Sequence, residues 1–112
     1  MTHHMNLHPR FFDQILNGAK TIEVRLNDKK RRLLKVGDHI EFTSRANPKM
    51  KVRTEIIKLF PFPTFSELFN AFPAEAFGAA SEECLTEIYT HYTKDDENHY
   101  GVLGIQLKKL KT

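Results

Sequence analysis

The chain has 112 residues and a mass of 13.0 kDa, enough for one hydrophobic core but too little for two ordinary domains, so we expect a single domain over residues 1–112. Hydrophobic residues make up 40% and charged residues 28% of the chain, a balance typical of folded globular proteins and not of disordered ones. The sequence has neither an apolar run long enough to cross a bilayer nor a secretion signal, so we expect a cytoplasmic protein without membrane association.

The formal net charge is only +3, but the basic residues are clustered. The main block contains Lys29, Lys30, Arg31, Arg32 and Lys35. Such a block attracts phosphate groups, and it is equally typical of a solvated turn between strands.

The first predicted elements are an extended start, a short helix and a strand. Pro9 suits the first position of a helix over residues 8–17, and Gly18 suits the left-handed residue that follows it. From Thr21 to Leu26 apolar and polar residues alternate, which predicts a half-buried strand. Its apolar face would carry Ile22, Val24 and Leu26, and its polar face Thr21, Glu23 and Arg25.

Two further strands are predicted in the middle of the chain. Gly37-Asp38 indicates a turn before an alternating run that contains Ile40 and Phe42. A third strand starts at Met50 and runs to Leu59, with a bulge expected near Ile56 and Ile57. The prolines Pro61 and Pro63 are expected to end the sheet.

A helical insertion follows, and then a last strand. Thr64 and Glu67 form a capping-box pattern for a helix from Phe65 to Ala71. Ser81 is expected to cap a second helix, whose apolar stripe consists of Leu85, Ile88, Tyr89 and Tyr92. Many of the phenylalanines lie in this region and are expected to pack the insertion onto the sheet. Strand character returns from Tyr100 to Leu110.

Short turns rather than crossover helices join the central strands, which favours antiparallel pairing. We therefore predict an α+β fold: a small, mostly antiparallel β-barrel of about five to six strands, with an N-terminal helix and a helical insertion before the last strand.

The most informative residues stand where the first helix ends and the strand begins. Alternation places Thr21, Glu23 and Arg25 along one face, and Lys20 can lean toward them. If this face is buried, Glu23 must pair with Lys20 or Arg25. If it is exposed, these are ordinary surface ion pairs.

This segment resembles the core motif of the ASCH domain family, Gly-x-Lys-x-x-Glu-x-Arg, with Gly18, Lys20, Glu23 and Arg25 in its positions. The turn at Val36-Gly37-Asp38 and the stretch from Tyr100 to Ile105 are similar to the same family. The resemblance implies a PUA-like β-barrel with a cleft beside the motif, and a family that acts in RNA binding.

Two functions follow from these observations. The first is binding of RNA, or of a nucleoside-like or nucleotide-like small molecule, in a basic cleft. Its contact residues would be Lys20, Glu23, Arg25, Lys29, Lys30, Arg31, Arg32, His99 and Tyr100. The Phe-rich insertion allows a third, weaker function, an adaptor that binds a protein partner.

The second function is hydrolysis of N4-acetylcytidine or a similar small amide. Some small ASCH proteins remove this acetyl group with a lysine, a threonine and a glutamate. The resemblance assigns the lysine to Lys20 and places Glu23 where the threonine stands, so Thr21 is the candidate nucleophile. Carboxylates that could assist are Glu23 and, in the insertion, Glu75, Glu82 and Glu83.

The remaining reactive side chains predict no cofactor. The histidines show no spacing that suits a metal site, and nothing in the sequence fixes an oligomeric state. Cys84 has no partner for an internal disulfide. It is expected to be a small buried apolar residue, with a catalytic thiol as the alternative.

Overall fold

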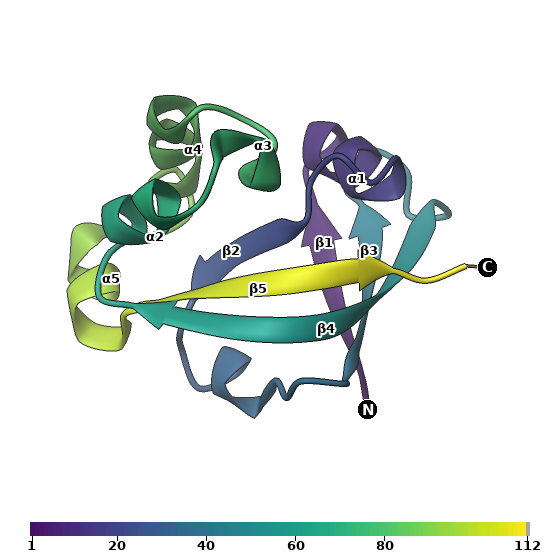
Figure 1. Ribbon diagram of the computed structural model, residues 1–112, viewed down its shortest axis with the longest axis horizontal. Helices are drawn as coiled ribbons and strands as arrows, with labels where there is room; N and C mark the ends of the chain where they lie inside the picture. Colours follow the sequence, from purple (N-terminus) through teal and green to yellow (C-terminus); the bar gives the residue numbers. More distant parts are fainter. Residues whose placement is uncertain (112) are drawn as a thin grey trace.

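The computed structural model describes residues 1–111. Over these residues a five-stranded sheet has the order β1 (Thr2–Leu7), β3 (His39–Ser44), β4 (Lys51–Phe62), β5 (Val102–Lys109) and β2 (Ile22–Leu26). β1 and β3 are parallel, and the other neighbours are antiparallel. The sheet curls into a half-barrel, and the helix α1 (Pro9–Leu16) lies over one end of it (Figure 1). The predicted α+β barrel-like fold is confirmed.

The curl depends on β4, which pairs with different strands along its length. Its first part pairs with β3 up to Glu55, and from Thr54 to Phe62 it pairs with β5. The register shifts between Ile56 and Lys58, so Ile57 is the extra residue of the bulge that the sequence predicted. A bulge bends its strand and increases the local twist, which lets β4 turn from one half of the sheet to the other.

The prediction that Pro61 ends the sheet was wrong. β4 continues to Phe62, and Pro61 pairs with Leu103 of β5. Because β3 pairs with β4 only as far as Glu55, Pro61 lies where β4 has a neighbour on one side, and a proline there can turn its missing N–H to the open side.

Local sequence signals fix α1 as predicted. Pro9 occupies the first turn, and Gly18 follows the helix with φ +83°, a left-handed conformation that glycine adopts without strain. Phe12 and Ile15 are buried in the core inside the half-barrel, whereas Leu16 is at the exposed edge. α1 therefore closes that core and brings the chain to the start of β2.

The sheet carries a core on each face. The inner core contains Met5, Leu7, Phe12, Ile15, Leu34, Ile40, Phe42, Val52, Ile56, Leu103, Ile105 and Leu107. The outer core contains Ile22, Val24, Leu26, Phe65, Leu68, Phe69, Phe77, Cys84 and Val102. The outer core lies beneath the insertion, which consists of α2 (Phe65–Ala71), α3 (Ala74–Phe77), α4 (Ser81–Ile88) and α5 (Lys94–Tyr100) (Figure 1). As predicted, the phenylalanines of this region pack the insertion onto the sheet.

Three details of the insertion differ from the sequence-based expectation. The helices α3 and α5 were not predicted, and Ala80 rather than Ser81 is the N-cap of α4. α5 is fixed by a capping box between Thr93 and Asp96, a Thr-x-x-Asp pattern in which the aspartate replaces the usual Glu or Gln. The last strand consequently begins at Val102, because Tyr100 still belongs to α5.

The predicted extended start is the strand β1. His3 and His4 lie in β1, and the His3 ring Nε2 is 2.8 Å from a carboxylate oxygen of Asp38. Within residues 1–111, none of the helices is both long and apolar enough to cross a membrane.

Candidate functional site

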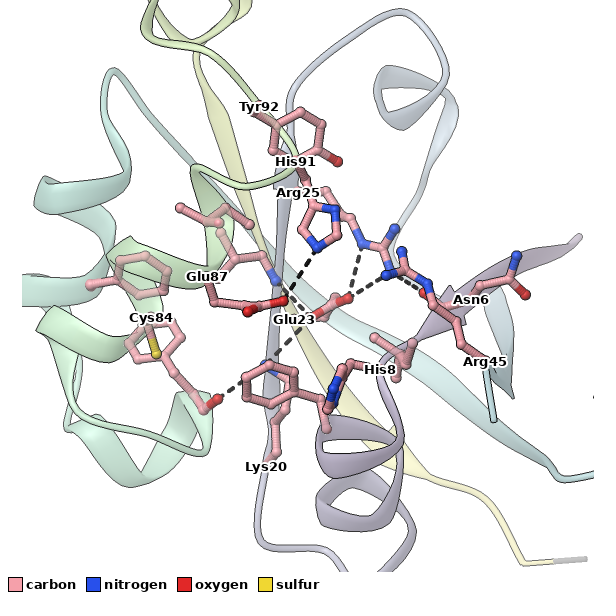
Figure 2. Close-up of a pocket in the computed structure, with 16 residues that line it drawn as sticks. Asn6, His8, Lys20, Glu23, Arg25, Arg45, Cys84, Glu87, His91 and Tyr92 are labelled. Atoms are coloured by element: carbon pink, nitrogen blue, oxygen red, sulfur yellow. Dashed lines mark hydrogen bonds and ion pairs between the residues drawn. The ribbon is translucent and has the colours of Figure 1, made fainter. Parts of the chain in front are cut away.

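A pocket of about 140 Å³ opens between α1, β2 and the insertion (Figure 2). Its floor contains Lys20, Glu23 and Arg25 of the predicted motif. Its apolar lining consists of Leu7, Phe11, Val24, Phe69, Phe77 and Ile88. Polar side chains around it come from Asn6, His8, Arg45, Glu87, His91 and Tyr92.

The topology explains why the polar face of β2 forms this floor. Glu23 pairs with Ile105 and Arg25 with Leu103, and directly opposed residues of antiparallel strands share a face. Glu23 and Arg25 are therefore on the inner face of the sheet, while Val24 and its apolar neighbours lie under the insertion. β2 is consequently covered on both sides.

Glu23 joins the other two motif side chains into a buried cluster. Its carboxylate oxygens lie 3.4 Å from Lys20 Nζ and 2.8 Å from Arg25 Nη2, and Arg25 Nε donates a hydrogen bond of 2.9 Å. The Val24 backbone N–H donates to the same carboxylate. Two hydrogen bonds and two ion pairs therefore hold this carboxylate. We call Lys20, Glu23 and Arg25 the buried triad.

The other members of the buried triad are held as firmly. Lys20 Nζ donates hydrogen bonds to the carbonyl oxygens of Ile22 and Phe77, at 2.8 and 3.2 Å, in addition to its ion pair with Glu23. Arg25 Nη2 donates to the Asn6 carbonyl at 2.9 Å. That bond links β2 to β1, the two edge strands of the half-barrel.

Burial and pairing act in opposite directions on the buried triad. Burial alone raises the pKa of Glu23, but the charges of Arg25 and Lys20 and the hydrogen bonds outweigh it, and the pKa lies below its ordinary value. For Arg25, burial lowers the pKa, but the charges and hydrogen bonds of Glu23 and Tyr92 together outweigh burial, and the pKa lies above its ordinary value. Both groups are therefore ionised at neutral pH.

Folding stability is expected to fall as the pH drops below the ordinary glutamate pKa of about 4.3. Because the pKa of Glu23 is lower in the folded protein, the unfolded chain takes up the proton first, and the stabilisation is lost as the pH falls through the folded-state pKa. Urea unfolding of the wild type and of Glu23→Gln from about pH 6 to pH 3 measures this. The wild type should lose more stability over this range. If the stability of the two proteins changes equally with pH, Glu23 does not have a lowered pKa in the folded protein.

Cys84 lies in the pocket wall but has the properties of a structural residue. Its thiol is buried, and burial raises its pKa above the ordinary value. Its Sγ lies 3.5 Å from the Ala79 carbonyl oxygen, which accepts the weak S–H bond. A protonated, buried thiol is a poor nucleophile, which favours the predicted packing role.

The structure does not bring Thr21 into the pocket. Thr21 precedes β2, which begins at Ile22, and its side chain is exposed and does not line the pocket. The Thr21 backbone is instead used structurally, since its N–H donates to Ala76 and its carbonyl accepts from Leu107. A nucleophilic role for Thr21 therefore has no support in this geometry.

The basic block also lies away from the pocket, beyond the other end of β2 (Figure 1). Lys29 and Lys30 are exposed, Arg31 pairs with Asp28 at 3.2 Å, and Arg32 donates to the Asn27 carbonyl. His99 and Tyr100 are at the end of α5 and do not line the pocket.

The carboxylate that the insertion contributes to the pocket is Glu87. The sequence had singled out Glu75, Glu82 and Glu83, of which the last two line a neighbouring groove between α1 and α4. Glu87 lies outside the apolar stripe of Leu85, Ile88, Tyr89 and Tyr92, so the helical period did not distinguish it from the other glutamates of the insertion. Arg45, the first residue after β3, also carried no signal that placed it in the pocket.

The fold has counterparts among known proteins. The model of the ASCH domain family matches residues 5–111. No match is found among curated proteins. The solved structure of hypothetical protein PH0355 has 27% identity and a TM-score of 0.86, and covers 98% of this chain and 100% of its own. Protein PF0455 from Pyrococcus furiosus has 29% identity and a TM-score of 0.78, with full coverage of both chains. An ASCH protein from Zymomonas mobilis, at 14% identity and a TM-score of 0.71, shares the fold over 96% of this chain and 66% of its own.

Proposed function

This chain belongs to the ASCH domain family, and we propose that it binds RNA or a nucleotide-like ligand in the pocket beside its Gly-x-Lys-x-x-Glu-x-Arg motif. One observation carries the proposal. The pocket joins a charged, ion-paired floor to apolar and aromatic walls in a volume of about 140 Å³. A cavity of about 150 Å³ holds a single benzene ring, so this one suits a single planar base.

The walls and the rim match the two parts of such a ligand. Phe11, Phe69, Phe77 and Ile88 line the walls, and Phe11, the half-buried ring among them, supplies aromatic surface against which a base can pack. Arg45, His91 and Tyr92 supply polar groups at the rim, where a ribose and its substituents would lie. A concave, mostly apolar site with a few fixed polar groups is the usual form of a small-molecule pocket.

The proposal gives the motif residues different roles. Glu23 and Lys20 are paired with each other and hydrogen-bonded to protein groups, so they shape and charge the floor. Arg25 faces the pocket from the same cluster and is the motif residue best placed to contact the ligand (Figure 2).

The basic block enters the proposal only for longer RNA. β2 has 5 residues and therefore spans roughly 16 Å. An RNA chain bound in the pocket would need several further nucleotides to reach Lys29 and Lys30. We call the proposed contact of RNA with the basic block the second contact. The exposed His99 would lie near it, because Arg32 of the block donates a hydrogen bond to the carbonyl of Tyr100, the residue after His99.

Binding is expected to be lost when the pocket is filled. Ile88 is half-buried in the wall, so Ile88→Trp places an indole in the space proposed for the base. Ile57→Trp adds the same ring at the exposed bulge of β4 and serves as the matched control. Titration of a labelled single-stranded RNA and of the four ribonucleosides, at low and moderate salt, measures the affinities. The wild type and Ile57→Trp should bind, more tightly at low salt for RNA, and Ile88→Trp should not.

The proposal fails if the wild type binds neither RNA nor nucleoside at low salt, or if Ile88→Trp binds as well as the wild type. Circular dichroism of both tryptophan variants separates a filled pocket from a misfolded chain. Replacing Lys29 and Lys30 by glutamate tests the second contact, and should weaken binding of the RNA without changing binding of nucleosides.

Hydrolysis of N4-acetylcytidine is a second candidate. A buried lysine next to a glutamate beside a ring-sized pocket favours it, and the position of Thr21 means that water would have to be the nucleophile. Incubation with N4-acetylcytidine and chromatography for cytidine decides between the two functions. If the wild type releases cytidine and Lys20→Ala does not, the protein is a hydrolase. If the wild type releases no more cytidine than Lys20→Ala, the hydrolase function is excluded.

A further inference from the structure

The charges that line the pocket do not cancel. Its formally charged side chains are the cations Lys20, Arg25 and Arg45 and the anions Glu23 and Glu87. Three positive charges thus face two negative ones, with His8 and His91 counted as neutral. The pocket therefore has an excess of positive charge.

The excess is located at Arg45. Lys20 and Arg25 share Glu23, and Glu87 lies 3.3 Å from the His91 ring. Across residues 1–111, Arg45 has no carboxylate within ion-pair distance. Arg45 is thus the pocket cation that has no protein anion to neutralise it.

The backbone holds Arg45 at a fixed place beside the pocket. Its N–H donates to the Leu7 carbonyl at 2.8 Å, which extends the parallel pairing of β1 and β3 by one residue. The Ser44 hydroxyl then accepts from the Ala46 N–H and turns the chain away. The side chain consequently starts next to the end of β1.

Arg25 reaches the same place from the other side. Its Nη2 donates to the carbonyl of Asn6, the residue before Leu7. Figure 2 shows the Arg45 side chain directed toward Arg25, with Asn6 beside both. Two guanidinium groups repel each other, and an oxyanion between them would remove the repulsion and accept hydrogen bonds from both. Guanidinium groups match phosphate oxygens well in charge and in geometry.

We infer that the ligand of this pocket carries a phosphate group, which Arg45 and Arg25 bind at the rim while the base occupies the pocket. The inference rests on the proposed function and adds to it which residues bind the phosphate of the ligand. Arg45 is then the residue that distinguishes a nucleotide from its nucleoside.

The test compares each ribonucleoside with its 5′- and 3′-monophosphates by calorimetry and by amide chemical shifts, at low salt. In the wild type, one of the two monophosphates should bind roughly tenfold more tightly than its nucleoside, as expected for charge-assisted hydrogen bonds. In Arg45→Gln this ratio should fall to near one, and in Arg45→Lys it should be partly retained. The control Arg53→Gln removes an exposed guanidinium that pairs with Glu41 outside the pocket, and should keep the wild-type ratio. Inorganic phosphate serves as a competitor and should displace the nucleotide but not the nucleoside.

The inference is overturned if nucleosides and monophosphates bind equally, or if the preference for the monophosphate survives Arg45→Gln. Those results leave the proposed pocket intact, because nucleosides would still bind and still be excluded by Ile88→Trp. If no nucleoside and no nucleotide shifts any pocket amide, both the inference and the proposed function fail.

Discussion

Glu23→Ala is expected to lower the free energy of unfolding by about 3–5 kcal/mol and to abolish ligand binding. Glu23 is the shared partner of Lys20 and Arg25, whose side chains are only 5% and 13% exposed. Removing the carboxylate leaves two like charges buried near each other, with carbonyl oxygens as their remaining acceptors. The cost is that of uncompensated buried charge, which exceeds the loss of one surface ion pair.

Urea unfolding at neutral pH measures this effect, and titration with the ligand used for the wild type measures binding. Glu41→Ala is the control, since Glu41 also pairs with two basic residues, Lys51 and Arg53, but on the outer surface of the sheet. The urea concentration at which half of the Glu41→Ala protein is unfolded should stay close to that of the wild type. Glu23→Gln keeps the shape and should fall between the two. If Glu23→Ala unfolds at the same urea concentration as Glu41→Ala, the buried triad does not stabilise the fold.

Glu97→Ala is expected to destabilise the protein by about 2–4 kcal/mol and to loosen the insertion. The Glu97 side chain is buried and accepts the Phe65 backbone N–H at 2.6 Å. The Tyr89 hydroxyl donates to the same carboxylate, at 2.9 and 3.1 Å from its two oxygens. Glu97 thereby joins α5 to the first residue of α2 and to the end of α4. Its removal leaves a buried N–H and a hydroxyl without their acceptor.

Chemical denaturation and hydrogen exchange of the α2 amides measure this loss. Asp95→Ala is the control, because Asp95 is an exposed residue in the first turn of the same helix. The tyrosine titration gives an independent reading: burial and the hydrogen bond to Glu97 raise the pKa of Tyr89, so the variant should have a lower Tyr89 pKa than the wild type. Stability equal to that of Asp95→Ala, with an unchanged tyrosine titration, would show that Glu97 does not hold the insertion.

The parts of the fold that the sequence predicted well are those set by neighbouring residues. Pro9 and Gly18 define α1 because caps act within one turn of a helix, and the alternation from Ile22 to Leu26 defines β2 because side chains in a strand have a period of two. α5 was not predicted, although Thr93 and Asp96 form a capping box. Its sequence is mostly charged and polar, and its buried residue is the glutamate Glu97, so no apolar stripe indicates a helix.

The candidate site was predictable only where its residues are close in sequence. The motif placed Lys20, Glu23 and Arg25 together, and the structure shows the distances that join them. Glu87 and Arg45 come from α4 and from the end of β3, and only the folded chain brings them to the same pocket. The basic block follows β2 directly in the sequence, but it lies beyond the far end of that strand and does not reach the pocket. Its position in the fold could not be predicted from its closeness to the motif.

By itself the sequence determined that β2 has one apolar and one charged face, that a glycine ends the helix before it, and that a lysine, a glutamate and an arginine follow at fixed spacing. Only the tertiary structure decided which face of β2 points into the half-barrel. The insertion covers the apolar face, so the charged face turns into the half-barrel and Glu23 must satisfy both of its basic neighbours. The reason is that a strand's periodicity sets its two faces, whereas burial of each face depends on contacts between residues far apart in the chain.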